Sequence, residues 1–250
     1  AATLEGRSGT EAEVASLHTR ALEIRERSLG PENPDLAIYL YGMANVLIEQ
    51  GSLESARQHL ARAKTLWEQS RGPESLEVAR ALIALGSIFI REGQCVEARG
   101  QFQRALEIQH EALGADHPDI GYSQSNLARS FECEGAYPEA ERRYQDALEW
   151  WERTLGATHP RVGYTRRQLA SVDLRQGKTD DARAHAEQAV AILEAAEGER
   201  ESLAEARLVL ARALWADPSQ RARSRQLALD AREDHPEPAE IDAWLADHAR

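Results

Sequence analysis

The chain has 250 residues, of which 42% are hydrophobic, and it carries a formal net charge of −12. Because like charges repel, this balance argues against broad, non-specific affinity for nucleic acid or anionic membranes. Good helix formers such as Ala, Leu, Glu, Arg and Gln dominate, and runs of β-branched residues are missing. The composition therefore favours an all-α fold.

Cysteine content and hydropathy bear on the compartment. Two cysteines, Cys95 and Cys133, are too few for a disulfide framework or a metal site, which predicts reduced thiols in an intracellular setting. No apolar run approaches the roughly 20 residues needed to span a bilayer. The first thirty residues also lack the apolar core of a signal peptide. We therefore expect a soluble, cytoplasmic protein with no metal and no cofactor.

Small residues recur along the chain with a step of 42 positions. One glycine series comprises Gly30, Gly72, Gly114, Gly156 and Gly198, and a second comprises Gly9, Gly51, Gly93, Gly135 and Gly177. Two alanine series keep the same step, Ala56, Ala98, Ala140 and Ala182, and Ala21, Ala63, Ala105, Ala147 and Ala189. A fixed period of this length is typical of a solenoid, in which each repeat buries its apolar face against its neighbours.

Residues 1–29 predict a partial N-terminal repeat. Ala2 and Leu4 occupy the phase that later repeats give to the end of a first helix, which indicates either a fragment of a longer protein or a half-repeat that has decayed. A second helix is expected from Glu11 to Ser28, with an apolar face formed by Val14, Leu17, Ala21, Leu22 and Ile24. An incomplete repeat leaves an apolar face open, so self-association is one option there.

Four full repeats are expected at 30–71, 72–113, 114–155 and 156–197. In three of them a first helix (helix A) begins at Asn33-Pro34, His117-Pro118 or His159-Pro160, since proline suits the first helical turn. A glycine of the second series ends helix A in a left-handed conformation. The loop to the second helix (helix B) is short, so the two helices must be antiparallel neighbours.

The chain ends in a less regular part. Residues 198–234 form a degenerate repeat, whose helix A matches the others only after a one-residue deletion and whose turn glycine is replaced by Asp217-Pro218. Residues 235–250 predict a capping helix with Ile241, Trp244 and Leu245 on one face. A half-polar terminal helix covers the open end of such an array.

The phase pattern within a repeat resembles the tetratricopeptide repeat. In the third repeat the matching positions are Leu127, Ala128, Phe131, Gly135, Tyr137, Ala140, Tyr144 and Ala147. The 42-residue length and the L-G-x-x-H-P-D segment are similar to the repeats of kinesin light chains and their bacterial relatives. The resemblance implies a right-handed solenoid of antiparallel helix pairs. The segment 239–246 also resembles the tails of repeat regions fused to large bacterial Ser/Thr kinases.

Residues that could carry chemistry are better explained as structural. The histidines of the His-Pro pairs recur in equivalent loops, so they lie far apart, and the Trp150-Trp151 pair and Trp67 fall late in helix B. No Ser-His-Asp set, glycine-rich phosphate loop or metal-ligand spacing is present. We expect no enzymatic activity.

The resemblance implies a concave groove lined by one stripe of each helix A. The ten candidate peptide-binding residues of this stripe are Tyr41, Asn45, Arg80, Arg91, Tyr122, Asn126, Arg129, Tyr164, Arg167 and Arg175. Arg outnumbers acidic residues in the stripe, although the chain as a whole is acidic. This distribution predicts an acidic or carboxylate-bearing peptide ligand, because the guanidinium fork binds carboxylates through two parallel hydrogen bonds.

Three functions fit these observations. The first is a scaffold that binds a peptide or partner segment in the helix-A groove. The second is a C-terminal regulatory or sensor region of a larger signalling protein, such as a bacterial Ser/Thr kinase. The third, RNA binding in the Arg-lined groove, fits the net charge least well, and a membrane partner is not expected.

Overall fold

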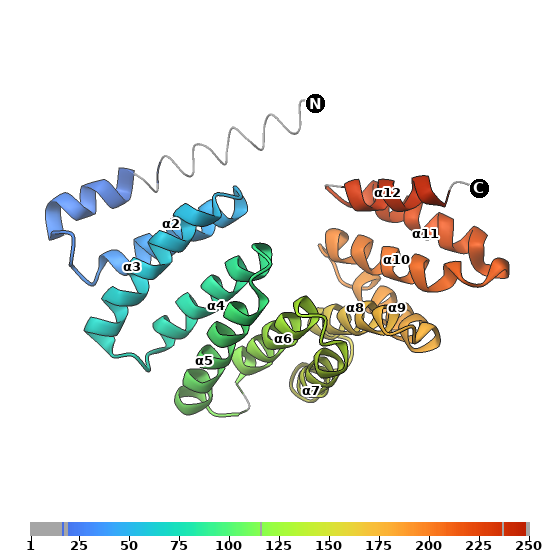
Figure 1. The fold of residues 1–250 in the computed structure, drawn as a ribbon, viewed down its shortest axis with the longest axis horizontal. Coiled ribbons are helices and arrows are strands. Elements are labelled where there is room, and N and C mark those ends of the chain that lie inside the picture. The colour runs from blue at the N-terminus through green and yellow to red at the C-terminus, as the bar shows by residue number, and fades with distance from the viewer. Residues whose placement is uncertain (1–16, 18–19, 116, 237, 249–250) are drawn as a thin grey trace. The chain divides into compact units, whose positions relative to one another are not determined.

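The computed structural model describes residues 17, 20–115, 117–236 and 238–248, and within these ranges the regular elements are all helices (Figure 1). The chain divides into two compact units, Ala1–Glu134 (unit 1) and Gly135–Arg250 (unit 2). Ala2, Leu4 and Val14 of the predicted N-terminal repeat lie outside the described residues, whereas residues 20–29 are helical as expected.

Unit 1 is built from consecutive antiparallel helices (Figure 1). After the helix at 20–29 come α2 (Leu36–Glu49), α3 (Leu53–Arg71), α4 (Leu76–Arg91), α5 (Cys95–Leu113) and α6 (Pro118–Cys133). Each of these helices packs on the next, and α4 also touches both α2 and α6. The A helices α2, α4 and α6 are therefore neighbours along one face of the unit, which we call the helix-A face.

Unit 2 repeats the arrangement. It contains α7 (Tyr137–Leu155), α8 (Pro160–Arg175), α9 (Thr179–Glu194), α10 (Arg200–Trp215), a short 3-10 turn (Pro218–Gln220), α11 (Arg221–Asp234) and α12 (Ala239–Asp247). Consecutive helices pack together, and the A helices α8 and α10 also touch each other. The helix-A face of unit 2 is thus formed by α8 and α10.

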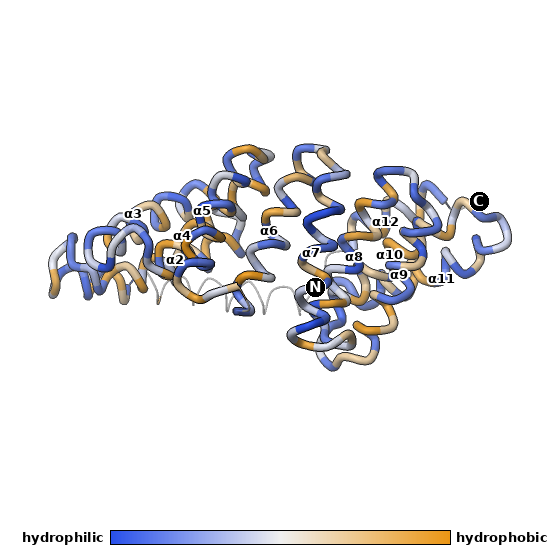
Figure 2. Tube along the Cα trace, turned by 90° about the horizontal axis from the view of Figure 1, so that it is seen from below, coloured by the Kyte–Doolittle hydropathy of each residue, from blue (hydrophilic) through white to orange (hydrophobic). Residues whose placement is uncertain are grey.

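Small residues mark the places where helices cross. Ala56, Ala98, Ala140 and Ala182 are all fully buried, as the 42-residue step predicts. The large side chains of Phe102 and Tyr144 are fully buried beside them. Hydrophobic and hydrophilic residues alternate along the helices (Figure 2), which is the pattern of an amphipathic helix with one face in the core. The all-α fold of stacked helix pairs is confirmed.

Glycines at both kinds of helix end adopt backbone conformations that other residues avoid. The glycines after helix A, Gly51, Gly93, Gly135 and Gly177, have φ between +72° and +75°. The glycines after helix B combine positive φ with extended ψ, as in Gly72 at +88° and 159°. That second region is essentially open to glycine alone. The predicted left-handed helix ends are confirmed.

The His-Pro pairs at 117–118 and 159–160 begin α6 and α8 in the same way. The Nδ1 atom of His117 accepts a hydrogen bond from the backbone N–H of Asp119 at 3.2 Å, and Nδ1 of His159 accepts one from Arg161 at 3.1 Å. Each imidazole thus satisfies an N–H that has no partner within the first turn of its helix. Both histidines are structural, as expected.

The expectation of two free thiols is wrong. Cys95, the first residue of α5, and Cys133, the last residue of α6, form a disulfide with their Cα atoms 5.5 Å apart. Two cysteines separated by 38 positions are brought together because α5 and α6 pack as antiparallel neighbours. The bond removes the argument from cysteine content for a reducing compartment, where disulfides are rare.

The terminal helix α12 covers an apolar surface of unit 2. Ile241 and Trp244 are buried in a cluster with Ala204, Leu208 and residues of α11. The Trp244 ring meets Trp215 edge to face, with centroids 5.5 Å apart. That this helix is needed as a cap stays a prediction. The described helices include none that is both long enough and apolar enough to traverse a lipid bilayer.

Candidate functional site

A cavity of about 430 Å³ opens on the helix-A face of unit 1. Four of the predicted groove residues line it, Tyr41 and Asn45 from α2, Arg80 from α4 and Tyr122 from α6. The other lining residues are Ile48, Ile83, Ala84, Ser87, Gln109 and Asp119. Side chains from three successive A helices therefore meet at one site, because the 42-residue step places equivalent positions side by side.

The lining side chains of this cavity differ in how firmly they are held. Tyr41 is partly buried, and its ring lies 5.7 Å from the ring of Trp67. Gln109 is buried and accepts a hydrogen bond from the hydroxyl of Ser123 at 2.5 Å. Tyr122, by contrast, is 41% exposed. Tyr41 and Gln109 are thus the firmly held side chains of the cavity, and Tyr122 forms an open aromatic rim.

Arg80 is the one predicted arginine that lines the unit 1 cavity, and it is exposed and has no ion pair within the described part of the chain. Asp119 lines the same cavity, so the formal charges of the two side chains cancel. The expected preference for acidic ligands therefore finds no excess of positive charge at this cavity.

Three other predicted residues of unit 1, Arg91, Asn126 and Arg129, do not line this cavity, and the two arginines form hydrogen bonds between repeats. Arg91 donates from Nη1 to the carbonyl oxygen of Ile48 at 2.7 Å, and Arg129 donates from Nη2 to the Ser87 hydroxyl at 3.3 Å. Asn126 is only 5% exposed, and its Nδ2 has no hydrogen-bond partner in the described residues. The two arginines thus link neighbouring A helices through hydrogen bonds. Asn126 has little surface that a ligand could contact.

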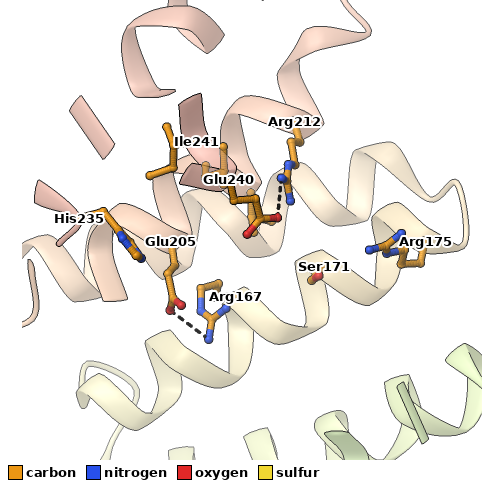
Figure 3. A pocket seen from close by; sticks show the side chains of 10 residues that line it. Arg167, Ser171, Arg175, Glu205, Arg212, His235, Glu240 and Ile241 are labelled. Carbon is orange, nitrogen blue, oxygen red and sulfur yellow. Dashed lines mark hydrogen bonds and ion pairs between the residues drawn. The ribbon is translucent and has the colours of Figure 1, made fainter. Parts of the chain in front are cut away.

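A second cavity, of about 210 Å³, lies on the helix-A face of unit 2 (Figure 3). Arg167, Ser171 and Arg175 line it from α8, and α12 contributes Glu240 and Ile241. The remaining lining residues are Glu205, Leu208, Val209 and Arg212 of α10, together with His235. Two of the predicted groove residues, Arg167 and Arg175, thus lie at the same cavity.

Two ion pairs cross the unit 2 cavity. Arg167 lies 3.3 Å from Glu205, and Arg212 lies 2.7 Å from Glu240 (Figure 3). Arg175 is exposed and makes no ion pair within the described residues. Arg212 and Glu240 were missed by sequence reasoning, because the degenerate repeat shifts helix A by one residue and α12 was expected only to cap.

Tyr164, the last predicted groove residue, has a structural role. It packs against a buried cluster of Ala189, Leu193, Leu203 and Ala206. Burial, followed by the hydrogen bond with Glu199, raises the pKa of its phenol. The side chain of Tyr164 packs between α8 and the start of α10. Tyr164 does not line either cavity.

The aromatic pair of α7 is also structural. Trp150 and Trp151 are 8% and 4% exposed, and their rings meet edge to face at 4.9 Å. A ligand site around these two indoles on the helix-B surface would need them to be accessible. No group of three or more His, Cys, Asp or Glu residues that could hold a metal ion occurs in the parts of the chain that the structure covers.

Comparison with known proteins gives a consistent assignment of the fold. The family model for the tetratricopeptide repeat matches residues 7–63, 37–109, 77–149 and 122–195. No curated protein sequence matches the chain significantly.

Solved structures with the same architecture are numerous. The chain is similar to BtubC (BKLC) from P. vanneervenii, at 19% identity and a TM-score of 0.68, over 94% of each chain. The chain is also similar to a Podosopora anserina protein described as a putative kinesin light chain with nearly identical TPR-like repeats. The sequence identity is 23% and the TM-score is 0.64, over 81% of this chain and 96% of that one. A third similar structure is a Rap protein complexed with competence and sporulation factor. Its sequence identity is 15% and its TM-score is 0.68, over 99% of this chain and 72% of that one.

Proposed function

Because the chain belongs to the tetratricopeptide repeat family, we propose that it is a protein-interaction scaffold that holds a peptide or partner segment against its helix-A face. One observation carries this proposal: side chains of α2, α4 and α6, which are far apart in the sequence, line a single cavity in unit 1. Long regular helices offer little irregular backbone on which to assemble catalytic groups, so we propose no enzymatic role.

The chemistry of the unit 1 cavity fits an extended peptide with an apolar anchor. Ile48, Ile83 and Ala84 supply apolar surface, while the rings of Tyr41 and Tyr122 flank it. Asn45 offers both a donor and an acceptor to a peptide main chain. Aromatic side chains provide large contact areas at small cost in conformational entropy. We therefore expect an aliphatic or aromatic ligand side chain to enter this cavity.

One similar structure supports a binding role. The Rap protein of that structure was determined as a complex with competence and sporulation factor. The TM-score of 0.68 indicates a shared helical architecture, and in that protein the architecture holds a bound factor. The ligand that we propose for the present chain is inferred from its own cavity residues.

The test is a peptide-display selection against the purified protein. Enriched peptides should share an apolar residue, and their affinity should fall at least about tenfold in Tyr122→Ala and Asn45→Ala, which lose part of the rim and the main-chain contact. Gln103→Ala, on the exposed surface of α5, is the matched control and should bind normally. Equal affinity for the wild type and all three variants would contradict the proposed site.

Several finer expectations stay proposals. A role as the regulatory or sensor region of a larger signalling protein is compatible with the scaffold, and so is self-association through the N-terminal repeat. A cytoplasmic location is also a proposal, and the Cys95–Cys133 disulfide weighs against a reducing compartment. RNA binding has no support from either cavity, because aromatic and basic side chains do not alternate along them.

A further inference from the structure

The unit 2 cavity gathers three arginines on one surface. Arg167, Ser171 and Arg175 are spaced four residues apart on α8, so they lie on the same side of that helix, and Arg212 faces them from α10 (Figure 3). With Glu205 and Glu240 at the same cavity, the formal charge is +1 before His235 is counted. The chain as a whole is at −12. The local sign is therefore opposite to that of the whole molecule.

The two glutamates show which chemistry this cavity accepts. Each lies against one guanidinium, Glu205 against Arg167 and Glu240 against Arg212, while Arg175 has no acidic partner within the described residues. Arginine binds carboxylates and phosphates through paired hydrogen bonds. The arginines thus already hold two carboxylates of the protein itself, and one guanidinium stays available.

Glu240 can leave its position at little cost. Its side chain is 73% exposed, and exposed ion pairs contribute little to stability. The next residue of α12, Ile241, is 3% exposed, and Trp244 is 8% exposed, so the helix is anchored by other side chains. Rotation of the Glu240 side chain would therefore free Arg212 without undocking α12.

We propose that this cavity binds the carboxylates of an acidic partner segment, and that Glu240 is a tethered competitor that such a segment displaces. The inference rests on the proposed scaffold function in that the ligand is part of a protein partner. Leu208, Val209 and Ile241 give the cavity an apolar floor, which favours an apolar residue between two acidic ones. A carboxylate segment of this pattern would use both the floor and the arginines.

The experiment is calorimetric titration of the full chain with a capped peptide that has one leucine between two glutamates. Glu240→Gln should bind it about two- to fivefold more tightly than the wild type, because one exposed competitor is removed. Arg175→Gln should bind it at least about fivefold more weakly. Glu201→Gln and Arg200→Gln make the same charge changes at exposed positions of α10 that do not line the cavity, so they should match the wild type.

Further measurements separate the alternatives. A peptide in which glutamine replaces both glutamates should not bind. Inorganic phosphate should bind more weakly than the acidic peptide, because phosphate makes no contact with the apolar floor. Phosphate binding as tight as the peptide, or equal affinity of Glu240→Gln and wild type, would overturn the proposal. If the acidic peptide does not bind at the unit 2 cavity but display still selects peptides for the unit 1 cavity, only the present inference is contradicted. If the acidic peptide binds saturably at the unit 2 cavity but no peptide binds at the unit 1 cavity, only the proposed unit 1 site is contradicted.

Discussion

Single small residues decide how closely the helices of this protein approach. Gly86 of α4 is the clearest case, since a Cβ atom built on it would lie 2.5 Å from Cε1 of Phe102. The Phe102 ring is fully buried and cannot move into solvent. The equivalent positions Ala44, Ala128 and Ala170 tolerate a methyl group and are fully buried. The glycine in the second repeat therefore makes room for the Phe102 ring in the position that this ring adopts.

Gly86→Ala should destabilise the protein even though alanine favours helix. The gain in helix propensity is about 1 kcal/mol, whereas overpacking of a rigid core costs about 1–3 kcal/mol. Gly100→Ala is the control, because Gly100 lies within α5 with nothing near its Cβ position and should be stabilised by up to about 1 kcal/mol. Thermal melting measures both, and a higher midpoint for Gly86→Ala would contradict the packing argument.

At the level of elements, the disulfide joins the first residue of α5 to the last residue of α6 and so links two successive repeats. A loop of 38 residues closed by one bond is expected to stabilise the folded state by about 2–4 kcal/mol. Dithiothreitol should therefore lower the melting temperature of the wild type, whereas Cys133→Ser should melt at one temperature with and without reductant. Two titratable thiols in protein purified without reductant would show that the bond does not form.

The terminal helix gives a second prediction for an element. Deleting residues 237–250 should expose Leu208 and Trp215, which α12 now covers, and should promote self-association. Melting and light scattering measure the two effects. Asp247→Asn leaves the apolar face of α12 intact and should behave as the wild type. A truncated chain that stays monomeric and equally stable would show that α12 is not a cap.

Local sequence patterns predicted the elements well and their tertiary partners only in part. Nearest-neighbour chemistry determines the glycine and alanine series, the His-Pro caps and the terminal helix. The 42-residue step makes such local patterns recognisable in the sequence. The disulfide was missed because it depends on the proximity of two helix ends that neither cysteine reveals alone. Glu240 was missed for a related reason, since its role follows from where α12 packs rather than from its sequence.

The structure brings only some of the predicted groove residues of unit 1 together at one cavity. Tyr41, Asn45, Arg80 and Tyr122 share one cavity because their repeats keep the regular step. Arg91 and Arg129 were predicted from the same stripe, but they form hydrogen bonds between repeats. A sequence stripe identifies the face on which a side chain lies, whereas the neighbouring repeat decides whether that side chain is free. Their availability to a ligand stays a prediction.

At the scale of the whole molecule, a repeat protein is stabilised mainly by contacts within repeats and between adjacent ones, so a perturbation should stay local. Ala140 of α7 is fully buried. Ala140→Trp should overpack this part of unit 2 and lower its free energy of unfolding by about 1–3 kcal/mol or more. Hydrogen exchange followed by mass spectrometry should then show faster exchange in α7, α8 and α9, which pack consecutively, and unchanged exchange in α2 and α3. Gln145→Ala, at an exposed position of the same helix, is the control and should leave exchange unchanged throughout. Equal acceleration in every helix would mean that the chain unfolds as one cooperative unit, and a single free energy of unfolding would then describe it.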